Sequence, residues 1–169
     1  MKLVTFTGLL ALGIAATAQE VRFDYDRSAN FSAYRTYQWA HKGAGRADQL
    51  MDQNIQRAID AQLVLKRLQR VESGGDLVVS YQAALDQEKE FNGFGTGPRF
   101  WGSTRVTSST IDIGKLVVDL FDPAKKQLVW RGAASKTLDI KKDPDKNYQN
   151  LQKAMAKLFK SYPPGSSKS

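Results

Sequence analysis

Hydrophobic and polar residues alternate most regularly between residues 114 and 132, in the run GKLVVDLFDPAKKQLVWRG. Residues 116–121 and 127–131 each alternate as the strands of a half-buried antiparallel pair do. Pro123 has no amide hydrogen and cannot continue a strand, so we place the turn at residues 122–126. The pattern predicts a β-hairpin whose core positions are Leu116, Val118, Leu128 and Trp130, with Asp122 and Pro123 in the turn.

The same alternation predicts further strands at residues 21–26, 34–40, 76–88 and 104–113, the last of which meets the hairpin at Gly114. The strand after the hairpin turn continues to residue 138. In the strand at 76–88 the inward positions are Leu77, Val79, Tyr81, Ala83 and Leu85. The length of this strand and of the one at 127–138 indicates hairpins that extend past the helix layer. The aromatic residues Tyr37, Trp39, Tyr81 and Trp130 are expected in the core beneath the helices, and a ligand-stacking strip is the alternative.

Two segments change to helical spacing. Residues 48–68 form the first, with Asp48 as N-cap and a break at Gly74-Gly75. Its apolar stripe is Met51, Ile55, Ala58, Ile59 and Leu63, and Asp52, Gln56, Arg57 and Asp60 lie on the other side. The second begins at Asp143-Pro144, an N-cap followed by proline, and stops at Pro163-Pro164. Its stripe is Leu151, Met155, Leu158 and Phe159.

The elements follow in the order ββαββββα. We expect a single α+β domain over residues 19–164, with both helices covering one face of a mainly antiparallel sheet. Residues 165–169 are predicted to be a disordered tail.

The first residues have the pattern of a secretory leader. A basic Met1-Lys2 precedes an apolar stretch at residues 3–16, and Ala16-Thr17-Ala18 fits a cleavage site. The stretch is shorter than the roughly 20 residues of a bilayer span, and no later segment is long or apolar enough. We therefore predict a signal peptide at residues 1–18, cleavage after Ala18 and an exported protein, periplasmic or secreted. A buried N-terminal helix or a retained anchor is the alternative.

The amino-acid composition limits the classes of binding partner that we expect. The chain has no cysteine, which excludes disulfides and a lipid anchor on a cysteine after the leader. It holds 25 Lys and Arg against 17 Asp and Glu, and Lys2 is the one charge in the leader, so the formal charge of +8 falls to +7 on cleavage. An exported basic protein meets envelope proteins, anionic glycans or lipid surfaces rather than nucleic acid. Because the basic residues are scattered, a merely solubilising charge is the alternative.

Several of these segments together resemble the domain-of-unknown-function family 4136 of exported bacterial proteins and lipoproteins. They are FDYD at residues 23–26, NFSAYRTYQW at 30–39, DLVVSY at 76–81, the hairpin pieces GKLVVDL, DP and LVWRG, and YPP at 162–164. The resemblance implies no activity, cofactor or substrate. Many members carry a cysteine after the signal, so membrane tethering does not transfer to this chain.

Members of that family often have glycine near the end of the first helix, where this chain has Arg67. A left-handed backbone conformation at this position would cost about 1 kcal/mol of stability with arginine instead of glycine. We therefore expect the first helix to run on by a turn.

The strongest binding candidate is the glycine- and aromatic-rich loop NGFGTGPRFWG at residues 92–102. Its Gly93, Gly95 and Gly97 do not make a phosphate cradle, because no helix N-terminus follows them. A mobile hairpin loop is the simple interpretation. The side chains suited to contact a partner, a glycan or a membrane surface are Phe91, Phe94, Arg99, Phe100 and Trp101.

Elsewhere the sequence offers only weak candidates for a catalytic or metal site. Asp24 and Asp26, joined by Asp119 or Asp122, could act as acid and base in a small hydrolase, although solvent-facing and turn roles explain them more simply. His41 is the single histidine and lacks the usual partners of a zinc site or a triad. The acidic residues near Asn147 lack the glycine and glutamate of a calcium loop; they are Asp139, Asp143 and Asp145. We expect no metal and no cofactor, and a noncatalytic binding or structural module with the hydrolase as alternative.

Overall fold

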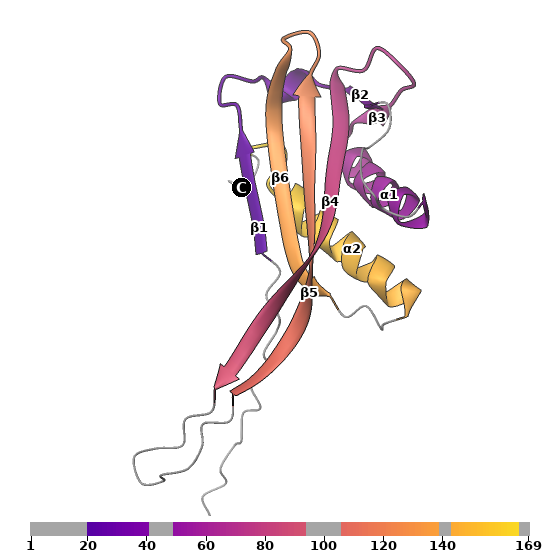
Figure 1. The fold of residues 1–169 in the computed structure, drawn as a ribbon. Coiled ribbons are helices and arrows are strands. Elements are labelled where there is room, and N and C mark those ends of the chain that lie inside the picture. The colour runs from indigo at the N-terminus through magenta and orange to yellow at the C-terminus, as the bar shows by residue number, and fades with distance from the viewer. Residues whose placement is uncertain (1–19, 41–48, 94–105, 139–142, 166–169) are drawn as a thin grey trace, which may run out of the picture.

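The computed structural model describes residues 20–40, 49–93, 106–138 and 143–165, and within these residues six strands form one sheet. The strand order across the sheet is β1-β6-β5-β4-β2-β3 (Figure 1). The elements are β1 (Glu20–Tyr25), the 3-10 helix η1 (Phe31–Ala33), β2 (Thr36–Trp39), α1 (Gln49–Leu65), β3 (Gln69–Arg70), β4 (Leu77–Gly93), β5 (Val106–Asp122), β6 (Gln127–Leu138) and α2 (Pro144–Phe159). The predicted α+β class and the order ββαββββα are confirmed.

The strand boundaries differ from the prediction most at β5, and β4 also extends five residues beyond the predicted end at residue 88. β5 runs without a break from Val106 to Asp122, whereas the sequence pattern predicts two strands that meet at Gly114. The short strand β3, Gln69–Arg70, follows α1 instead. Two residues are too few to show alternation, so a sequence pattern cannot reveal β3.

The sheet is antiparallel from β1 through β6 and β5 to β4, and parallel where β2 joins β4 and β3. β2 and β4 are neighbours although α1 lies between them in the chain, and such a parallel pair requires a crossover connection. Both helices pack behind the sheet in Figure 1, and the face turned to the viewer carries none of the described helices. We call this helix-free side the open face.

Apolar side chains on the helix side of the sheet form the core. The helices contribute Ile55, Ala58, Ile59 and Leu63 from α1 and Met155, Leu158 and Phe159 from α2. The sheet contributes Leu77, Val79, Tyr81, Leu116, Val118, Leu120, Val129 and Trp130, all buried. Burying a side chain such as Leu or Phe contributes about 1.5–3 kcal/mol, so this one-sided layer is the main source of stability. The predicted stripes are confirmed except for Met51, which is exposed in the first turn of α1, one turn before the first buried residue.

β4 and β5 continue as a two-stranded arm beyond the helix layer, as predicted for the strand at 76–88 (Figure 1). The other strand expected to extend, β6, ends at Leu138 opposite Asp112 and does not join the arm. Their pairing extends from Val78 opposite Phe121 to Gly93 opposite Val106. Leu85, a predicted inward position, is 55% exposed. Along the same face of β4 Tyr81 is buried and Ala83 is partly buried, so the alternation continues at Leu85 without a layer to cover it.

The hairpin between β5 and β6 has the predicted turn and one unpredicted irregularity. Leu120 pairs with Trp130 but Phe121 pairs with Leu128, which leaves Val129 as an extra residue on β6. Such a β-bulge reverses the face of the residues beyond it. Leu128 is therefore on the open face beside Phe121 and 39% exposed, and its predicted core position is wrong.

α1 ends at Leu65 rather than running on, so the expected extension is also wrong. Arg67 adopts the left-handed conformation, with φ of 65°. The amide of Leu68 donates to the carbonyl of Leu63 at 3.0 Å and that of Arg67 to Val64 at 2.9 Å, which is the Schellman pattern. Leu63 and Leu68 are both buried, and their burial holds the cap in place although arginine is poorly suited to it.

The other predicted helix boundaries can be compared where the residues are described. Asp143 caps α2 by accepting from the amide of Asp145 at 3.0 Å, and Pro144 occupies the first turn, as predicted. The break after the first helix includes Gly74, whose φ of 70° favours glycine. The proposed N-cap Asp48, the segment 1–19 and residues 166–169 lie outside the described residues.

Arg67→Gly should stabilise the protein, because glycine adopts the left-handed conformation without the steric penalty that arginine suffers. We expect the free energy of unfolding to rise by about 0.5–1 kcal/mol in urea titrations. Arg57→Gly, at an exposed interior position of α1, is the control and should lower it by about 1 kcal/mol. A loss of stability in Arg67→Gly would contradict this description of the cap.

Candidate functional site

The four carboxylates considered as acid and base do not converge on one site. Asp24 is exposed on β1 and accepts from the amide of Tyr25 at 2.8 Å. Asp119 accepts two hydrogen bonds from the Arg131 guanidinium, at 2.6 and 2.7 Å, on the open face. Asp122 is buried beneath the hairpin turn, and Asp26 lies just past the end of β1. Three of the four, Asp26, Asp119 and Asp122, accept hydrogen bonds from side chains that are distant in the sequence.

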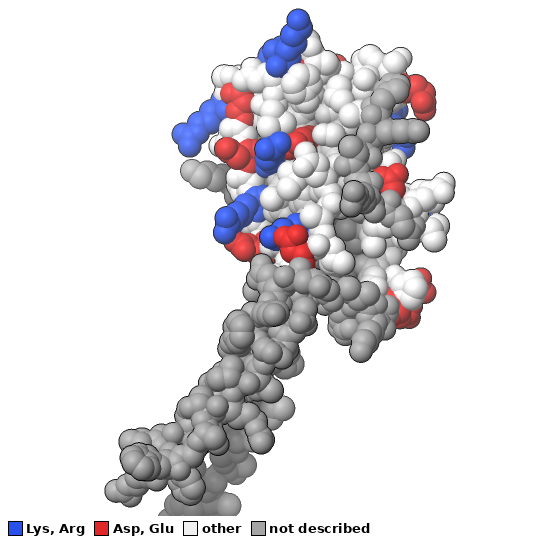
Figure 2. Space-filling view, in the orientation of Figure 1, with Lys and Arg blue, Asp and Glu red and all other residues white. Residues whose placement is uncertain are grey.

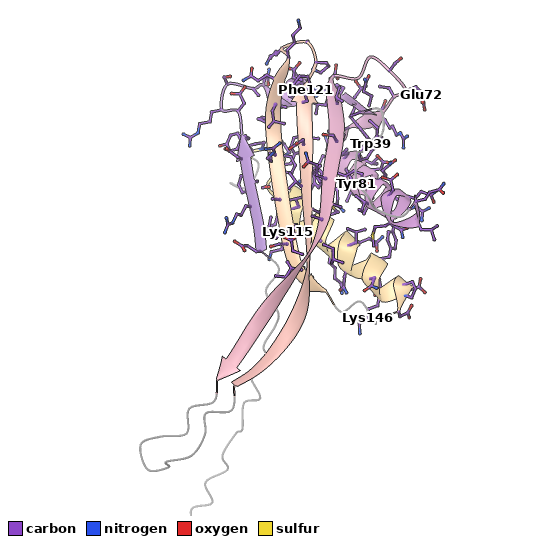
Figure 3. The ribbon with its side chains drawn as sticks, in the orientation of Figure 1. Trp39, Glu72, Tyr81, Lys115, Phe121 and Lys146 are labelled. Atoms are coloured by element: carbon purple, nitrogen blue, oxygen red, sulfur yellow. The ribbon has the colours of Figure 1, made fainter. Side chains whose placement is uncertain are left out.

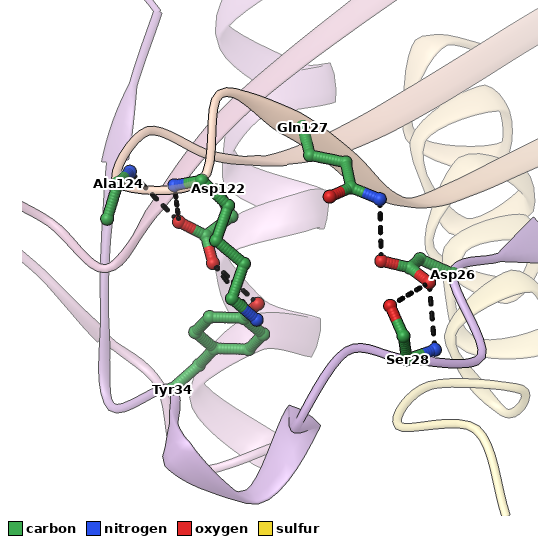
Figure 4. A network of polar contacts seen from close by, with 7 residues as sticks. Asp26, Ser28, Tyr34, Asp122, Ala124 and Gln127 are labelled. Atoms are coloured by element: carbon green, nitrogen blue, oxygen red, sulfur yellow. Dashed lines mark hydrogen bonds and ion pairs between the residues drawn. The ribbon is translucent and has the colours of Figure 1, made fainter.

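Asp122 organises the hairpin turn (Figure 4). One carboxylate oxygen accepts from the amides of Ala124 at 2.9 Å and Lys125 at 3.0 Å, and the other accepts from the Tyr34 hydroxyl at 2.9 Å. Burial alone would raise the pKa of Asp122, but the bonds from Lys125, Tyr34 and Ala124 together lower it. Burial and the same contact raise the pKa of Tyr34 to about 12. The predicted turn role of Asp122 is correct, and its bond to Tyr34 also fixes the segment before β2.

Asp26 forms a second polar centre beside the turn (Figure 4). It accepts from the hydroxyl of Ser28 at 2.7 Å, the amide of Ser28 at 2.8 Å and the side-chain amide of Gln127 at 2.8 Å. The Ser28 hydroxyl, followed by its amide, lowers the pKa of Asp26. A general acid near neutral pH needs a raised pKa, so Asp26 has the opposite tuning.

Asp76 performs a comparable structural task at the start of β2. Its carboxylate accepts from the amides of Arg35 at 2.8 Å and Thr36 at 2.9 Å, and its own amide donates to the Thr36 hydroxyl at 3.0 Å. The amide bonds from Arg35 and Thr36 lower the pKa of Asp76. The parallel pairing of β2 with β4 therefore begins at an anchored point.

Polar residues of α1 face the sheet and not only solvent, contrary to the sequence interpretation. Asp60 accepts from the hydroxyl of Tyr37 at 2.7 Å and the indole N–H of Trp39 at 3.0 Å, and it pairs with Arg70 at 3.1 Å. Gln56 lies one turn before Asp60 and donates a hydrogen bond to Asp52, a further turn earlier. Asp52 also accepts from the hydroxyl of Tyr81.

Asp52, Gln56 and Asp60 form a polar row along α1 that supplies hydrogen-bond partners to the hydroxyl and N–H groups of the sheet's aromatic side chains. Trp39 and Tyr81 contact each other edge to face, with ring centroids 6.1 Å apart (Figure 3). Burial first, and the bonds to Asp60 and Asp52 second, raise the pKa values of Tyr37 and Tyr81. The signal was the spacing of Asp52, Gln56 and Asp60 at four-residue intervals beside the apolar stripe. It places them on a flank of the helix that can reach tyrosine and tryptophan.

The predicted aromatic core thus consists of two groups. Trp39 and Tyr81 form one with Tyr37 beside α1. Trp130 belongs to the other group, beside α2. Its ring stacks on Phe159, with centroids 5.3 Å apart, and contacts Tyr162 edge to face, with centroids 5.7 Å apart. Tyr37, Tyr81 and Trp130 are buried, and Trp39 is half-buried. They serve the core rather than a ligand-stacking strip.

The loop residues singled out for binding, Phe94, Arg99, Phe100 and Trp101, lie outside the described residues, as do His41 and Asp139. The structure does place the two ends of their segment. Gly93 and Val106 are paired at the far end of the arm, away from both helices (Figure 1).

Charge on the visible face is mixed. Acidic and basic side chains are interspersed across the open face in Figure 2 rather than gathered by sign, in keeping with the pairs Arg131–Asp119 and Lys115–Asp86. Among the described residues, no group of three or more His, Cys, Asp or Glu side chains is arranged to hold a metal ion. Nor is any described helix long and apolar enough to cross a membrane.

The family model described as Domain of unknown function (DUF4136) matches residues 21–164. The chain belongs to this family. The resemblance seen in the sequence motifs is thereby confirmed, and the matched range runs from the second residue of β1 past the end of α2. No curated protein matches the chain of this DUF4136 member.

Solved structures share the fold of this DUF4136 protein at low identity. A PDZ domain protein from Parabacteroides distasonis matches with a TM-score of 0.59 and 12% identity. The match covers 86% of this chain but 36% of that longer one. PelC from Paraburkholderia phytofirmans, a dodecamer, matches with a TM-score of 0.53 and 10% identity over 84% of this chain and 95% of that one.

Tyr34→Phe should destabilise the protein, because it leaves a buried oxygen of Asp122 without its donor. We expect a loss of about 1.5–3 kcal/mol near neutral pH in urea unfolding. Because folding lowers the pKa of Asp122, its carboxylate contributes to the free energy of unfolding above the ordinary carboxyl pKa. This contribution is lost as the pH falls through the lowered pKa.

The difference between wild type and Tyr34→Phe should therefore stay constant from pH 7 down to about pH 4, the ordinary carboxyl pKa, and shrink as the pH falls further. Tyr25→Phe, at the exposed edge strand, is the matched control and should change stability by no more than about 0.5 kcal/mol. Equal effects of the two hydroxyl deletions would show that Tyr34 does not stabilise Asp122.

Proposed function

We propose that this DUF4136 protein is an exported, noncatalytic binding or structural module of the bacterial envelope, acting in the periplasm or outside the cell. The leader pattern at residues 1–18 supports export, and so does the resemblance of the sequence motifs to a family of exported bacterial proteins and lipoproteins. A formal charge of +7 after cleavage suits anionic glycans, lipid surfaces or acidic envelope proteins.

The observation that carries the proposal is the arm formed by β4 and β5. Its ladder continues to Gly93 and Val106, well past the helix layer (Figure 1). At about 3.4 Å per residue, the part of β4 from Leu85 to Gly93 reaches roughly 27 Å. A domain that needed only a stable core would gain nothing from this extension, whereas a binding module gains reach.

The segment carried by the arm has the composition of a contact surface. Phe94, Phe100 and Trp101 are aromatic and Arg99 is cationic, and aromatic residues and arginine dominate the energetically important positions of interfaces. We infer that these four residues form the binding surface. PelC, which has a similar fold, is a dodecamer, which is a precedent for a structural role in a larger assembly.

The carboxylates lend no comparable support to the alternative, a small hydrolase using Asp24 and Asp26. The three hydrogen bonds that Asp26 accepts and its lowered pKa fit a structural acceptor. Asp24 bonds to its own strand at the amide of Tyr25.

Replacing Phe94, Phe100 and Trp101 together by alanine should weaken binding to the physiological surface, because the aromatic anchors are lost. The probes are vesicles containing anionic phospholipid, lipopolysaccharide and peptidoglycan, each measured by co-sedimentation with the purified protein. We expect the dissociation constant for at least one probe to rise about tenfold or more.

The matched control is Phe121→Ala with Leu128→Ala, which removes exposed apolar side chains at the opposite end of the sheet. It should leave binding unchanged. Far-ultraviolet circular dichroism would establish that both variants fold. Binding that is equal in wild type and the triple variant on every probe would contradict the role of the loop. Hydrolysis of an ester or glycan that Asp24→Asn abolishes without unfolding would favour the alternative.

A further inference from the structure

Among the described strands, β1 lies at the edge of the sheet and has one neighbour, β6. It pairs antiparallel with β6, from Glu20 opposite Ser135 to Tyr25 opposite Trp130, and no described strand lies beyond it. A strand at the edge of a sheet offers its outward N–H and C=O groups to another strand. What matters is which groups point outward and what side chains accompany them.

The hydrogen bond that closes the β1–β6 ladder identifies the outward groups. The amide of Asp26 donates to the carbonyl of Val129 at 2.9 Å. Because ladder bonds alternate along an antiparallel strand, the even-numbered residues of β1 bond to β6 and the odd-numbered ones point away. The outward residues are Val21, Phe23 and Tyr25. In agreement, the amide of Tyr25 bonds to the carboxylate of Asp24 at 2.8 Å instead of to a strand.

The side chains of β1 separate by face. Phe23 and Tyr25 lie on the helix side, 50% and 36% exposed, with their rings stacked at 6.4 Å. Glu20, Arg22 and Asp24 lie on the open face, where Arg22 pairs with Glu20 at 2.5 Å. Native edge strands are usually protected from self-pairing by charges that repel. This strand instead carries both signs next to an exposed aromatic pair.

We propose that β1 pairs antiparallel with β1 of a second copy of this chain, about a twofold axis at Phe23. Phe23 then lies opposite the partner's Phe23, and Val21 opposite the partner's Tyr25. These are the outward residues, so both strands present their free backbone groups to each other. On the open face Arg22 lies opposite the partner's Asp24, twice by symmetry.

The charges select this register. A shift that centres the axis on Arg22 sets two arginines opposite each other, and one that centres it on Asp24 sets two aspartates opposite each other. Like charges directly opposite destabilise a strand pair, whereas opposite charges stabilise it. At the ends of the proposed pairing Glu20 meets the partner's Asp26, but Arg22 and Gln127 already accompany these two carboxylates.

The symmetry has a geometric consequence. A twofold axis that keeps like residues on the same face is perpendicular to the sheet, so the helices of both copies lie on one side and the open faces join into one surface. The two arms then point in opposite directions. The dimer does not depend on the proposed function, because it uses β1 and not the loop at residues 94–105.

Charge exchange tests the pairing. Arg22→Asp sets aspartate opposite the partner's Asp24, and Asp24→Arg sets arginine opposite the partner's Arg22. In sedimentation velocity experiments we expect a concentration-dependent dimer for wild type and a dissociation constant at least about tenfold weaker for either variant. An equimolar mixture of the two variants restores opposite charges and should form a heterodimer, and Arg22→Asp with Asp24→Arg in one chain should dimerise again.

Phe23→Pro tests the backbone part. Proline removes the outward amide hydrogen and no bond to β6, so the variant should keep the fold and lose the dimer. If it fails to fold, the charge variants decide, because both positions are exposed. Wild type that remains monomeric at its highest soluble concentration would overturn the proposal. So would a dimer that neither charge variant weakens.

Discussion

The fold depends on the space that Gly132 leaves for Trp130. The indole of Trp130 is fully buried on the helix side of the sheet, stacked on Phe159 of α2. A Cβ at position 132 would overlap the indole ring and lie 2.8 Å from Leu158. The indole N–H has no hydrogen-bond partner within the described residues, which costs about 1–3 kcal/mol. Packing of the ring between sheet and helix offsets that cost.

Other features of the structure follow from this contact. The bulge at Val129 brings Trp130 opposite Leu120, and in doing so it turns Leu128 to the open face. Tyr162 contacts both Trp130 and Phe31, whose ring in turn contacts Tyr34. The hydroxyl of Tyr34 then holds Asp122. One aromatic chain thus connects α2, the segment after β1 and the hairpin turn.

Features that depend on neighbours in the chain could be predicted, and features that depend on contacts between distant segments could not. Alternation and capping residues located the hairpin, both helices and the Asp143 cap, because each depends on local chemistry. The bulge at Val129 and the parallel pairing of β2 with β4 arise from long-range packing. So does the left-handed Arg67, which the burial of Leu68 fixes against arginine's own preference. The spacing of Asp52 and Asp60 places them on a flank of α1, but it does not say which residues they meet, and that depends on where the sheet positions Tyr37 and Tyr81.

The same one-sided core separates stability from the surfaces proposed for function. The helix side of the sheet carries the buried residues, while the arm, the outward edge of β1 and the open face lie outside that layer. The most direct test of this account is the urea unfolding of Gly132→Ala, with Ser135→Ala on the open face of β6 as control. We expect Gly132→Ala to lose about 2–3 kcal/mol or more through overpacking against Trp130, and the control to change by less than about 0.5 kcal/mol. A Gly132→Ala protein as stable as wild type would contradict the account.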